Sequence, residues 1–468
     1  MGCAMKLSIR CPFAANAKDV VIPQDGHGTP KRAGHEHAGK PRASCVPKPR
    51  CEGARTHAML RSPAQARNTI EADARRRRMS AASNTADREG SFLAANASLA
   101  CGGCALGWFT GGERSRRPRG ARGSRTFSPM KFPADTGPCW ADAHLDLAYL
   151  AVNGRDMRAS VPADAAHALT LPALRDGGVR VAFGTIFTEL GGDPATEAVG
   201  YRDSDDLEGA HRAGLRQLEW YEEMERAGEI AIVRSKADYA RALAGESALG
   251  IVLLMECADP IRSPDEVQWW HERGLRVVGL SWGHGSRYAG GNARAGGLTP
   301  IGRRMVEALD AQRILHDASH LSRAAFDDLF ALSPRMVIAS HSNAAALIGD
   351  NERHLTDGQI AALRDRDGWI GLNLYGRFLA NQRRATLDDC VAQVMHVAEI
   401  VGFARVGLGS DLDGGFDRMQ LPIEIQSPSD YELLLSGLER AGFLQAGGTR
   451  DGYAHANLSR VLRASGCL

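Results

Sequence analysis

The feature that most constrains the fold is a series of eight apolar segments beyond residue 140, each bounded by turn residues. Continuous apolar runs are typical of parallel strands that are buried on both faces. Most of these segments are separated by stretches with the 3.6-residue apolar period of a helix, namely 301–313, 322–333 and 387–403 among others. The segments themselves are 142–147, 179–187, 249–256, 275–282, 314–319, 335–341, 368–375 and 405–411.

Eight strands that alternate with helices predict an α/β fold, specifically a (β/α)8 TIM barrel over residues 130–468. A doubly wound open sheet is the structural alternative. No Gly-rich phosphate loop follows the first segment, so the sequence does not support a dinucleotide site of the kind that such sheets carry.

Residues 1–129 differ sharply in charge from the rest of the chain. They contain 23 Lys and Arg against 9 Asp and Glu, which leaves 34 against 46 for residues 130–468. Without an apolar period long enough to build a core, they are expected to form a disordered, basic extension. A transit peptide and a nucleic-acid-binding arm are alternatives, but aromatic residues are not interleaved with the arginines, which disfavours a nucleic-acid partner. We favour a third interpretation, in which the working protein begins at Met130.

The positions of the cysteines and the hydropathy of the chain indicate the cellular compartment of the protein. Six of the ten cysteines lie in residues 1–129, where Cys101 and Cys104 form a CxxC without a second pair at zinc-ribbon spacing. The remaining four are widely scattered, and no apolar stretch reaches the length of a membrane span or a secretory signal. The sequence therefore predicts a cytoplasmic protein that does not associate with membranes.

Polar residues stand at or just beyond the ends of the predicted strands. The carboxyl ends of the strands in a barrel of this kind meet at one rim, where the chemistry takes place. Each polar residue taken alone is explained as a hydrogen-bonded core side chain, but three histidines and three carboxylates at one rim can hold two divalent metals. A mixed nitrogen and oxygen ligand set suits zinc. The residues concerned are His144, Asp146, Glu256, Trp282, His320, His341, Tyr375 and Asp411.

Six short motifs in this order make the body resemble the membrane dipeptidase (renal dipeptidase) family of zinc peptidases, from about residue 140 to 465. The motifs are "DAHLDL" (142–147), "ME" (255–256), "DASHLS" (317–322), "SHSNA" (340–344), "RHLTD" (353–357) and "GSDLDGG" (409–415). The resemblance implies a dinuclear zinc hydrolase that cleaves dipeptides with a free C-terminal carboxylate. A homodimer is compatible with it.

The resemblance also assigns ligands for two zinc ions. It implies that His144 and Asp146 bind one zinc, that His320 and His341 bind the other, and that Glu256 bridges them. Two zinc ions lower the pKa of a shared water toward about 7, so a bridging hydroxide is the expected nucleophile.

Two further residues take their roles from the resemblance. Asp411 is implied to be the acid/base residue that moves the proton of the water to the leaving amine. Arg353 is implied to bind the terminal carboxylate of the substrate, for which a planar guanidinium is suited. The alternative for Arg353 is a surface charge in a loop.

One position departs from the family pattern. Trp282 stands where better-known members carry a histidine that contacts the substrate carbonyl, and His284 is close enough in sequence to reach the same space. Together with Tyr375, these two are our candidates for substrate contact. His316 is either a partner of the site or simply packed.

An alternative hypothesis is that the protein is an amidohydrolase-type metal barrel that acts on a cyclic amide, lactam or ester. Such barrels usually open with HxH and often use a modified lysine as the metal bridge. Here the first strand carries HxD, at His144 and Asp146, and the candidate bridge is Glu256, which favours the dipeptidase.

Overall fold

The computed structural model describes residues 139–162, 164–192 and 198–468. Eight parallel strands form a ring, which the pairing of its first and last members closes. The predicted TIM barrel is therefore confirmed, and the open sheet is wrong. In ring order the strands are β2 (Val179–Ile186), β1 (Trp140–Leu145), β13 (Val406–Leu408), β12 (Trp369–Leu372), β11 (Val337–Ala339), β10 (Leu315–Asp317), β7 (Leu275–Gly279) and β6 (Leu249–Met255).

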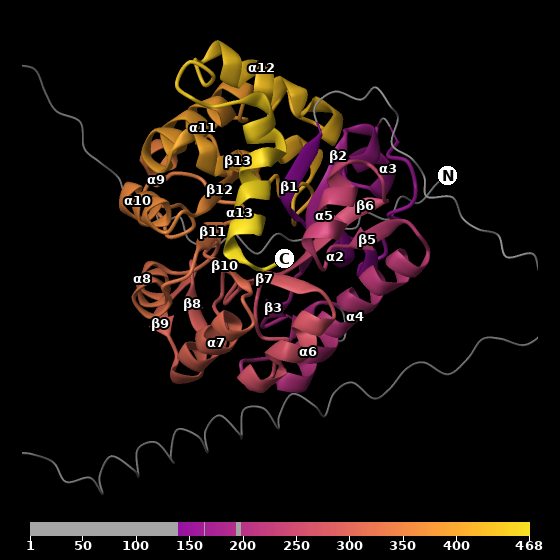
Figure 1. Cartoon of the computed structure of the whole chain (residues 1–468), viewed down its shortest axis with the longest axis vertical. Helices are drawn as coiled ribbons and strands as arrows, with labels where there is room; N and C mark the ends of the chain where they lie inside the picture. Colours follow the sequence, from indigo (N-terminus) through magenta and orange to yellow (C-terminus); the bar gives the residue numbers. More distant parts are fainter. Residues whose placement is uncertain (1–138, 163, 193–197) are drawn as a thin grey trace, which may run out of the picture. The chain divides into compact units, whose positions relative to one another are not determined.

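Helices surround the ring, and the sequence colours of Figure 1 progress around it. Local sequence explains several helix starts: Thr299 accepts a hydrogen bond from the backbone N–H of Gly302, and Pro300 occupies the first turn. The helices are α2 (Leu147–Val152), α3 (Leu171–Asp176), α4 (Leu207–Arg226), α5 (Lys236–Leu243), α6 (Val267–Glu272), α7 (Pro300–Ala311), α8 (Arg323–Leu332), α9 (Ala345–Ile348), α10 (Asp357–Asp365), α11 (Leu387–Val401), α12 (Glu432–Arg440) and α13 (Asn457–Ser465). The predicted helices within 301–313, 322–333 and 387–403 correspond to α7, α8 and α11.

Five short strands were not predicted. β5 (Ile230–Ile232) pairs with β6, outside the eight-membered ring. β3 (Glu189–Leu190) pairs with β4 (Gly200–Tyr201), and β8 (Ala289–Gly291) forms an antiparallel hairpin with β9 (Arg294–Leu298). Elements of two to five residues carry too little periodicity to be distinguished from loops.

The ring interior is apolar at its base and polar toward the carboxyl ends of the strands. Alternate residues of the strands, such as Val252, Leu254 and Trp369, pack into one interior cluster. Gly407 leaves the room that the Trp369 indole occupies, because a Cβ there would lie 2.6 Å from the ring. Toward the carboxyl ends, buried polar residues follow on these faces, at Thr185, Glu256, Asp317, Ser340 and Asn373.

Several strands end earlier than predicted. Trp282, Tyr375 and Asp411 each lie three residues beyond the last strand residue, at Gly279, Leu372 and Leu408. The chain leaves the extended conformation at these points: Asp411 has φ +59° and Tyr375 precedes a 3-10 turn. Leu280 and Leu374 continue the apolar pattern past the last strand residue, so periodicity alone carried two of these three predicted strands too far.

Several predictions concern parts of the chain that the structure does not describe. The basic extension, the start at Met130 and the Cys101–Cys104 pair all lie outside the described residues. Among those described, the cysteines Cys139, Cys257, Cys390 and Cys467 are free thiols. No helix in the described ranges is long and apolar enough to cross a membrane.

Candidate metal centre

Three histidines and one glutamate converge above the apolar base of the barrel. The Nε2 atoms of His144, His320 and His341 lie 3.7, 3.0 and 3.6 Å from Glu256 Oε1. The His320 and His341 Nε2 atoms are 2.9 Å apart, and the His144 ring stacks on His341 with 3.5 Å between centroids. The four side chains therefore present their ligand atoms to one small buried space.

Two aspartates complete the cluster on the His144 side. Asp146 Oδ1 lies 3.8 Å and Asp411 Oδ1 lies 4.0 Å from His144 Nε2. The Thr185 hydroxyl donates to Asp146, and the Asn373 amide donates to Asp411 Oδ2 at 2.9 Å. Asp146 lies one residue beyond β1, yet its carboxylate reaches the same space as the His144 ring, as the i, i+2 spacing predicts.

Hydrogen bonds on the opposite ring nitrogens orient the histidines. Ser340 Oγ donates to Asp317 Oδ2 at 2.5 Å and lies 2.8 Å from His341 Nδ1, from which it can accept. His320 Nδ1 lies 3.0 Å from Asn292 Oδ1, which can only accept. A hydrogen on each Nδ1 leaves the Nε2 lone pairs free for a cation, which is the usual arrangement around ligating histidines.

Burial sets the charge state of the cluster. It holds the pKa of His144, His320 and His341 well below the usual value, and the Arg353 charge adds to this in each case. Burial raises the pKa of Asp146 to about 6. It also raises the pKa of Glu256 well above its ordinary range, with the charges of neighbouring aspartates as a second cause. Neutral imidazoles beside crowded carboxylates form a site that positive charge stabilises.

This donor set fits divalent cations. His144 Nε2 is buried and has no hydrogen-bond partner, although it faces Asp146, Glu256 and Asp411. Imidazole nitrogens together with carboxylate oxygens are the ligands that zinc takes in proteins. The structure thus brings together all five predicted metal ligands, His144, Asp146, Glu256, His320 and His341.

An uncommon backbone conformation orients two side chains of the cluster. His320 and Asp411 have φ of +67° and +59°, in the left-handed region that non-glycine residues seldom adopt. Gly414 allows the tight approach of the loop after β13, because a Cβ there would lie 2.0 Å from Asp411 Oδ1. Uncommon backbone at the point of convergence is typical of a functional site.

Arg353 is buried beside this cluster, so the alternative of a surface charge is wrong. Its side chain donates to the His341 carbonyl at 2.8 Å and to Ser342 Oγ at 3.1 Å, and it lies 5.1 Å from the centre of the Phe378 ring. Burial lowers the pKa of Arg353, while the charges of Asp411, Glu256 and Asp317 raise it. The guanidinium is a buried cation within reach of the same space.

The three candidates for substrate contact lie in different surroundings. Trp282 is half-buried, with its ring centre 6.0 Å from that of His320. His284 is exposed and 5.5 Å from the Trp282 ring. Tyr375 stacks on Phe416 at 4.6 Å, on the side of β12 and β13.

Sequence reasoning missed the residues that orient the ligands. Asn292, Asp317, Ser340 and Asn373 were not singled out, although Asp317 and Ser340 lie inside quoted motifs. Asp317 ends β10 and Ser340 directly follows β11, so the inward register of these strands was the available signal for both, whereas Asn292 comes from an unpredicted hairpin. His316 points elsewhere, because its Nε2 lies 2.7 Å from Asp310 Oδ1 of α7.

Asp413 is a structural anchor for the loop that carries Asp411. Its buried carboxylate accepts from the backbone N–H of Ala168 and of Leu169, the latter at 2.9 Å, and pairs with Arg155. We expect Asp413→Ala to lower the free energy of unfolding by about 3–5 kcal/mol, because it leaves a partly buried cation and two amides without their acceptor. Urea unfolding measures this loss, with Asp327→Ala on the exposed surface of α8 as control. Wild-type stability in Asp413→Ala would contradict the anchoring role.

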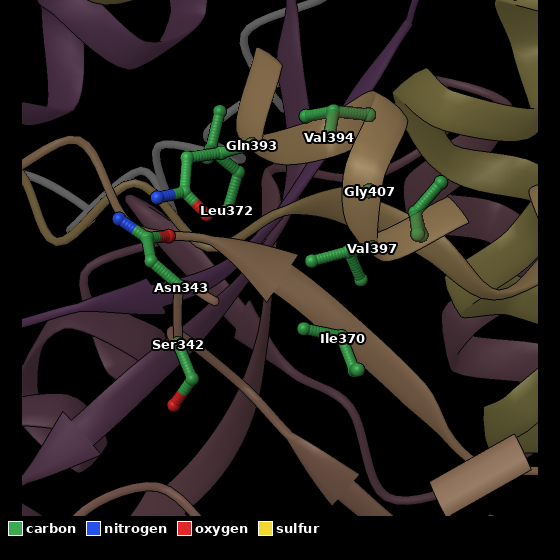
Figure 2. Close-up of a pocket in the computed structure, with 9 residues that line it drawn as sticks. Ser342, Asn343, Ile370, Leu372, Gln393, Val394, Val397 and Gly407 are labelled. Atoms are coloured by element: carbon green, nitrogen blue, oxygen red, sulfur yellow. The ribbon is translucent and has the colours of Figure 1, made fainter. Parts of the chain in front are cut away.

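A small cavity lies beneath helix α11 and is bordered by Ser342, the residue after His341 (Figure 2). Val394, Val397 and Ile370 line one part of it, and the amides of Asn343 and Gln393 lie at the other. Gln393 is already bound to the backbone of Ala344. The cavity is therefore a gap in packing between the ring and a helix.

The sequence matches the profile of a known protein family. The sequence profile described as "Membrane dipeptidase (Peptidase family M19)" matches residues 138–465. The chain belongs to the membrane dipeptidase family. The matched range contains every residue of the metal cluster together with Arg353.

Two curated relatives illustrate the similarity within and beyond bacteria. The chain is 30% identical over 250 residues to an uncharacterized protein in the pqqA 5' region of Klebsiella pneumoniae, which covers 51% of this chain and 89% of that protein. It is 31% identical over 158 residues to the dipeptidase aclJ of Aspergillus oryzae. The aligned stretch covers 32% of this chain and 37% of the fungal protein.

Solved structures of membrane dipeptidase family members have the same fold. A metallopeptidase of the family, dipeptidase AC, superimposes with a TM-score of 0.61 at 25% identity over 71% of this chain and 99% of its own. A metallopeptidase from Rhodobacter sphaeroides, solved with a phosphinate mimic of L-Ala-D-Ala, gives 0.60 at 24% identity over 70% of this chain and 100% of its own. Family and relatives together indicate a metal-dependent dipeptidase.

Proposed function

We propose that the protein is a dinuclear zinc dipeptidase that hydrolyses dipeptides with a free C-terminal carboxylate. The observation that carries the proposal is the convergence of three buried imidazoles on Glu256, with Asp411 and Arg353 beside them. The dipeptide mimic bound by the Rhodobacter relative supports this substrate class. The lactam alternative has no specific observation in its favour.

The ligands divide into two groups around Glu256. His144 and Asp146 would hold one zinc, His320 and His341 would hold the other, and Glu256 would bridge them, since its Oε1 faces ligand nitrogens of both groups. Such ions, when bound, polarise the substrate carbonyl and lower the pKa of a water toward about 7.

Asp411 would move the proton. Its Oδ1 faces the ligand space, while Asn373 holds Oδ2. A carboxylate in this position takes a proton from the attacking water and delivers it to the nitrogen of the leaving amine. Burial and the nearby Asp146 raise the pKa of Asp411 well above its usual value, so positive charge beside it is needed to keep the carboxylate ionised and able to accept a proton.

Arg353 would hold the substrate carboxylate, and this assignment predicts a specific loss. We expect Arg353→Ala to lower kcat/KM for free dipeptides by about 10- to 100-fold, mainly through KM, and to affect their C-terminal amides much less. A charge-assisted hydrogen bond contributes about 1.5–3 kcal/mol, and the amide lacks the charge. Steady-state kinetics on matched pairs of free and amidated dipeptides measures the difference. Equal losses for both substrates would mean that Arg353 only supports His341 and Ser342.

The proposal as a whole is tested with a dipeptide library. We expect the zinc-loaded full chain to hydrolyse dipeptides and to contain two zinc ions per chain by elemental analysis. If the protein binds the metal but cleaves lactams or cyclic amides instead of dipeptides, the result would contradict the dipeptidase proposal and support the amidohydrolase-type hypothesis. The homodimer and the cytoplasmic location stay predictions.

A further inference from the structure

We propose that Trp282 determines substrate specificity, by packing against an apolar or aromatic side chain on the amino-terminal residue of the dipeptide. The inference rests on the proposed function. It concerns a residue that touches the substrate side chain, while the metal ligands and the proton carrier keep the roles given above.

Trp282 belongs to a row of three aromatic rings at the carboxyl rim of the barrel. Phe187 meets Trp282 edge to face, with ring centres 5.1 Å apart, and Tyr149 meets Phe187 in the same way at 5.5 Å. Trp282 and Tyr149 are half-buried, and Phe187 is buried. The Trp282 ring lies 6.0 Å from the ligand His320. We call Tyr149, Phe187 and Trp282 the aromatic wall.

One member of the aromatic wall, Phe187, follows the strand that lies opposite the one preceding Arg353. Arg353 follows β11, and Phe187 follows β2, which is four strands from β11 in either direction around the eight-stranded ring. Trp282 follows β7, between the two. A dipeptide with its carboxylate at Arg353 and its amide at the metal ligands extends its amino-terminal residue toward this wall.

The backbone around Trp282 is held rigidly. The Trp282 carbonyl accepts from the Gly285 N–H at 2.8 Å and lies so close to Gly291 of β8 that a Cβ there would be 2.0 Å away. Phe187 is fixed at both backbone atoms by the Gln217 amide. Rigid aromatic surfaces bind apolar groups with little loss of conformational freedom.

The experiment compares substrates that differ at one end only. For the full zinc-loaded chain we measure kcat/KM for Phe-Ala, Leu-Ala, Gly-Ala and Asp-Ala, and for the reversed Ala-Phe and Ala-Gly. We expect wild type to favour Phe-Ala over Gly-Ala, Trp282→Ala to reduce that ratio about tenfold, and Trp282→Phe to retain most of it. The ratio of Ala-Phe to Ala-Gly is expected to stay constant.

A matched control removes a tryptophan elsewhere. Trp269 of α6 stacks under Arg273 at 3.5 Å on the helical layer, so Trp269→Ala should leave both ratios at the wild-type value. If Trp282→Ala does not fold, Trp282→Leu replaces it in the same comparison. An unchanged Phe-Ala to Gly-Ala ratio in folded Trp282 variants would overturn the inference while dipeptide hydrolysis stands. A wild-type protein that cleaves none of the dipeptides would overturn the proposed function itself, and the inference with it.

Discussion

Replacing Asp411 by asparagine is expected to lower kcat by about 10²–10⁴ while both metals stay bound, because general acid–base catalysis contributes about that much. Asparagine keeps the shape of the side chain, including the contact with Asn373, but cannot accept the proton. Steady-state kinetics and elemental analysis on the same preparation give the two measurements. A matched control is Asp310→Asn, which removes a carboxylate bound to His316 outside the site.

The same variant separates three roles for Asp411. Its Oδ1 lies 4.0 Å from His144 Nε2, so it stands close enough to be a proton carrier, a sixth metal ligand or a partner that orients His144. Loss of one metal in Asp411→Asn would identify a ligand. Near-normal kcat with both metals bound would remove the residue from catalysis.

Replacing Glu256 by glutamine is expected to reduce the metal content below two per chain and to abolish hydrolysis. Glu256 Oε1 faces the Nε2 atoms of His144, His320 and His341, and a neutral amide cannot bridge two cations as a carboxylate does. Zinc should then stabilise the variant less than wild type, because stabilisation by a bound ligand follows its affinity for the folded state.

Thermal unfolding with and without added zinc therefore supplies a measurement that does not depend on turnover. Glu225→Gln is the matched control, since Glu225 binds Arg234 on the outer side of the molecule. Native metal stoichiometry and a wild-type response to zinc in folded Glu256→Gln would exclude Glu256 as a ligand.

Strand periodicity explains why Glu256 could be predicted from sequence. Val252 and Leu254 pack inside the ring, so the period of two places Glu256 above them on the same face. The identity of the eight strands followed from apolar runs of adequate length. The resemblance to a known family then supplied roles that spacing alone left open.

Other parts of the site could not be predicted in this way. Arg353 lies in a loop, and only the packed structure shows that it is buried against His341 and Phe378. Asn292 reaches His320 from a hairpin too short to carry a periodic signal. The backbone turns at His320 and Asp411 are likewise set by loop packing.

Local apolar periodicity was enough to predict the barrel, the order of its strands along the chain and the polar residues near their carboxyl ends, because these features depend on the geometry common to parallel strands. The folded structure was needed to show where each strand ends, which groups orient the histidines and how Trp282 and Arg353 face the ligands. Those features depend on contacts between loops far apart in the sequence, and residue spacing along a single segment carries no information about such contacts.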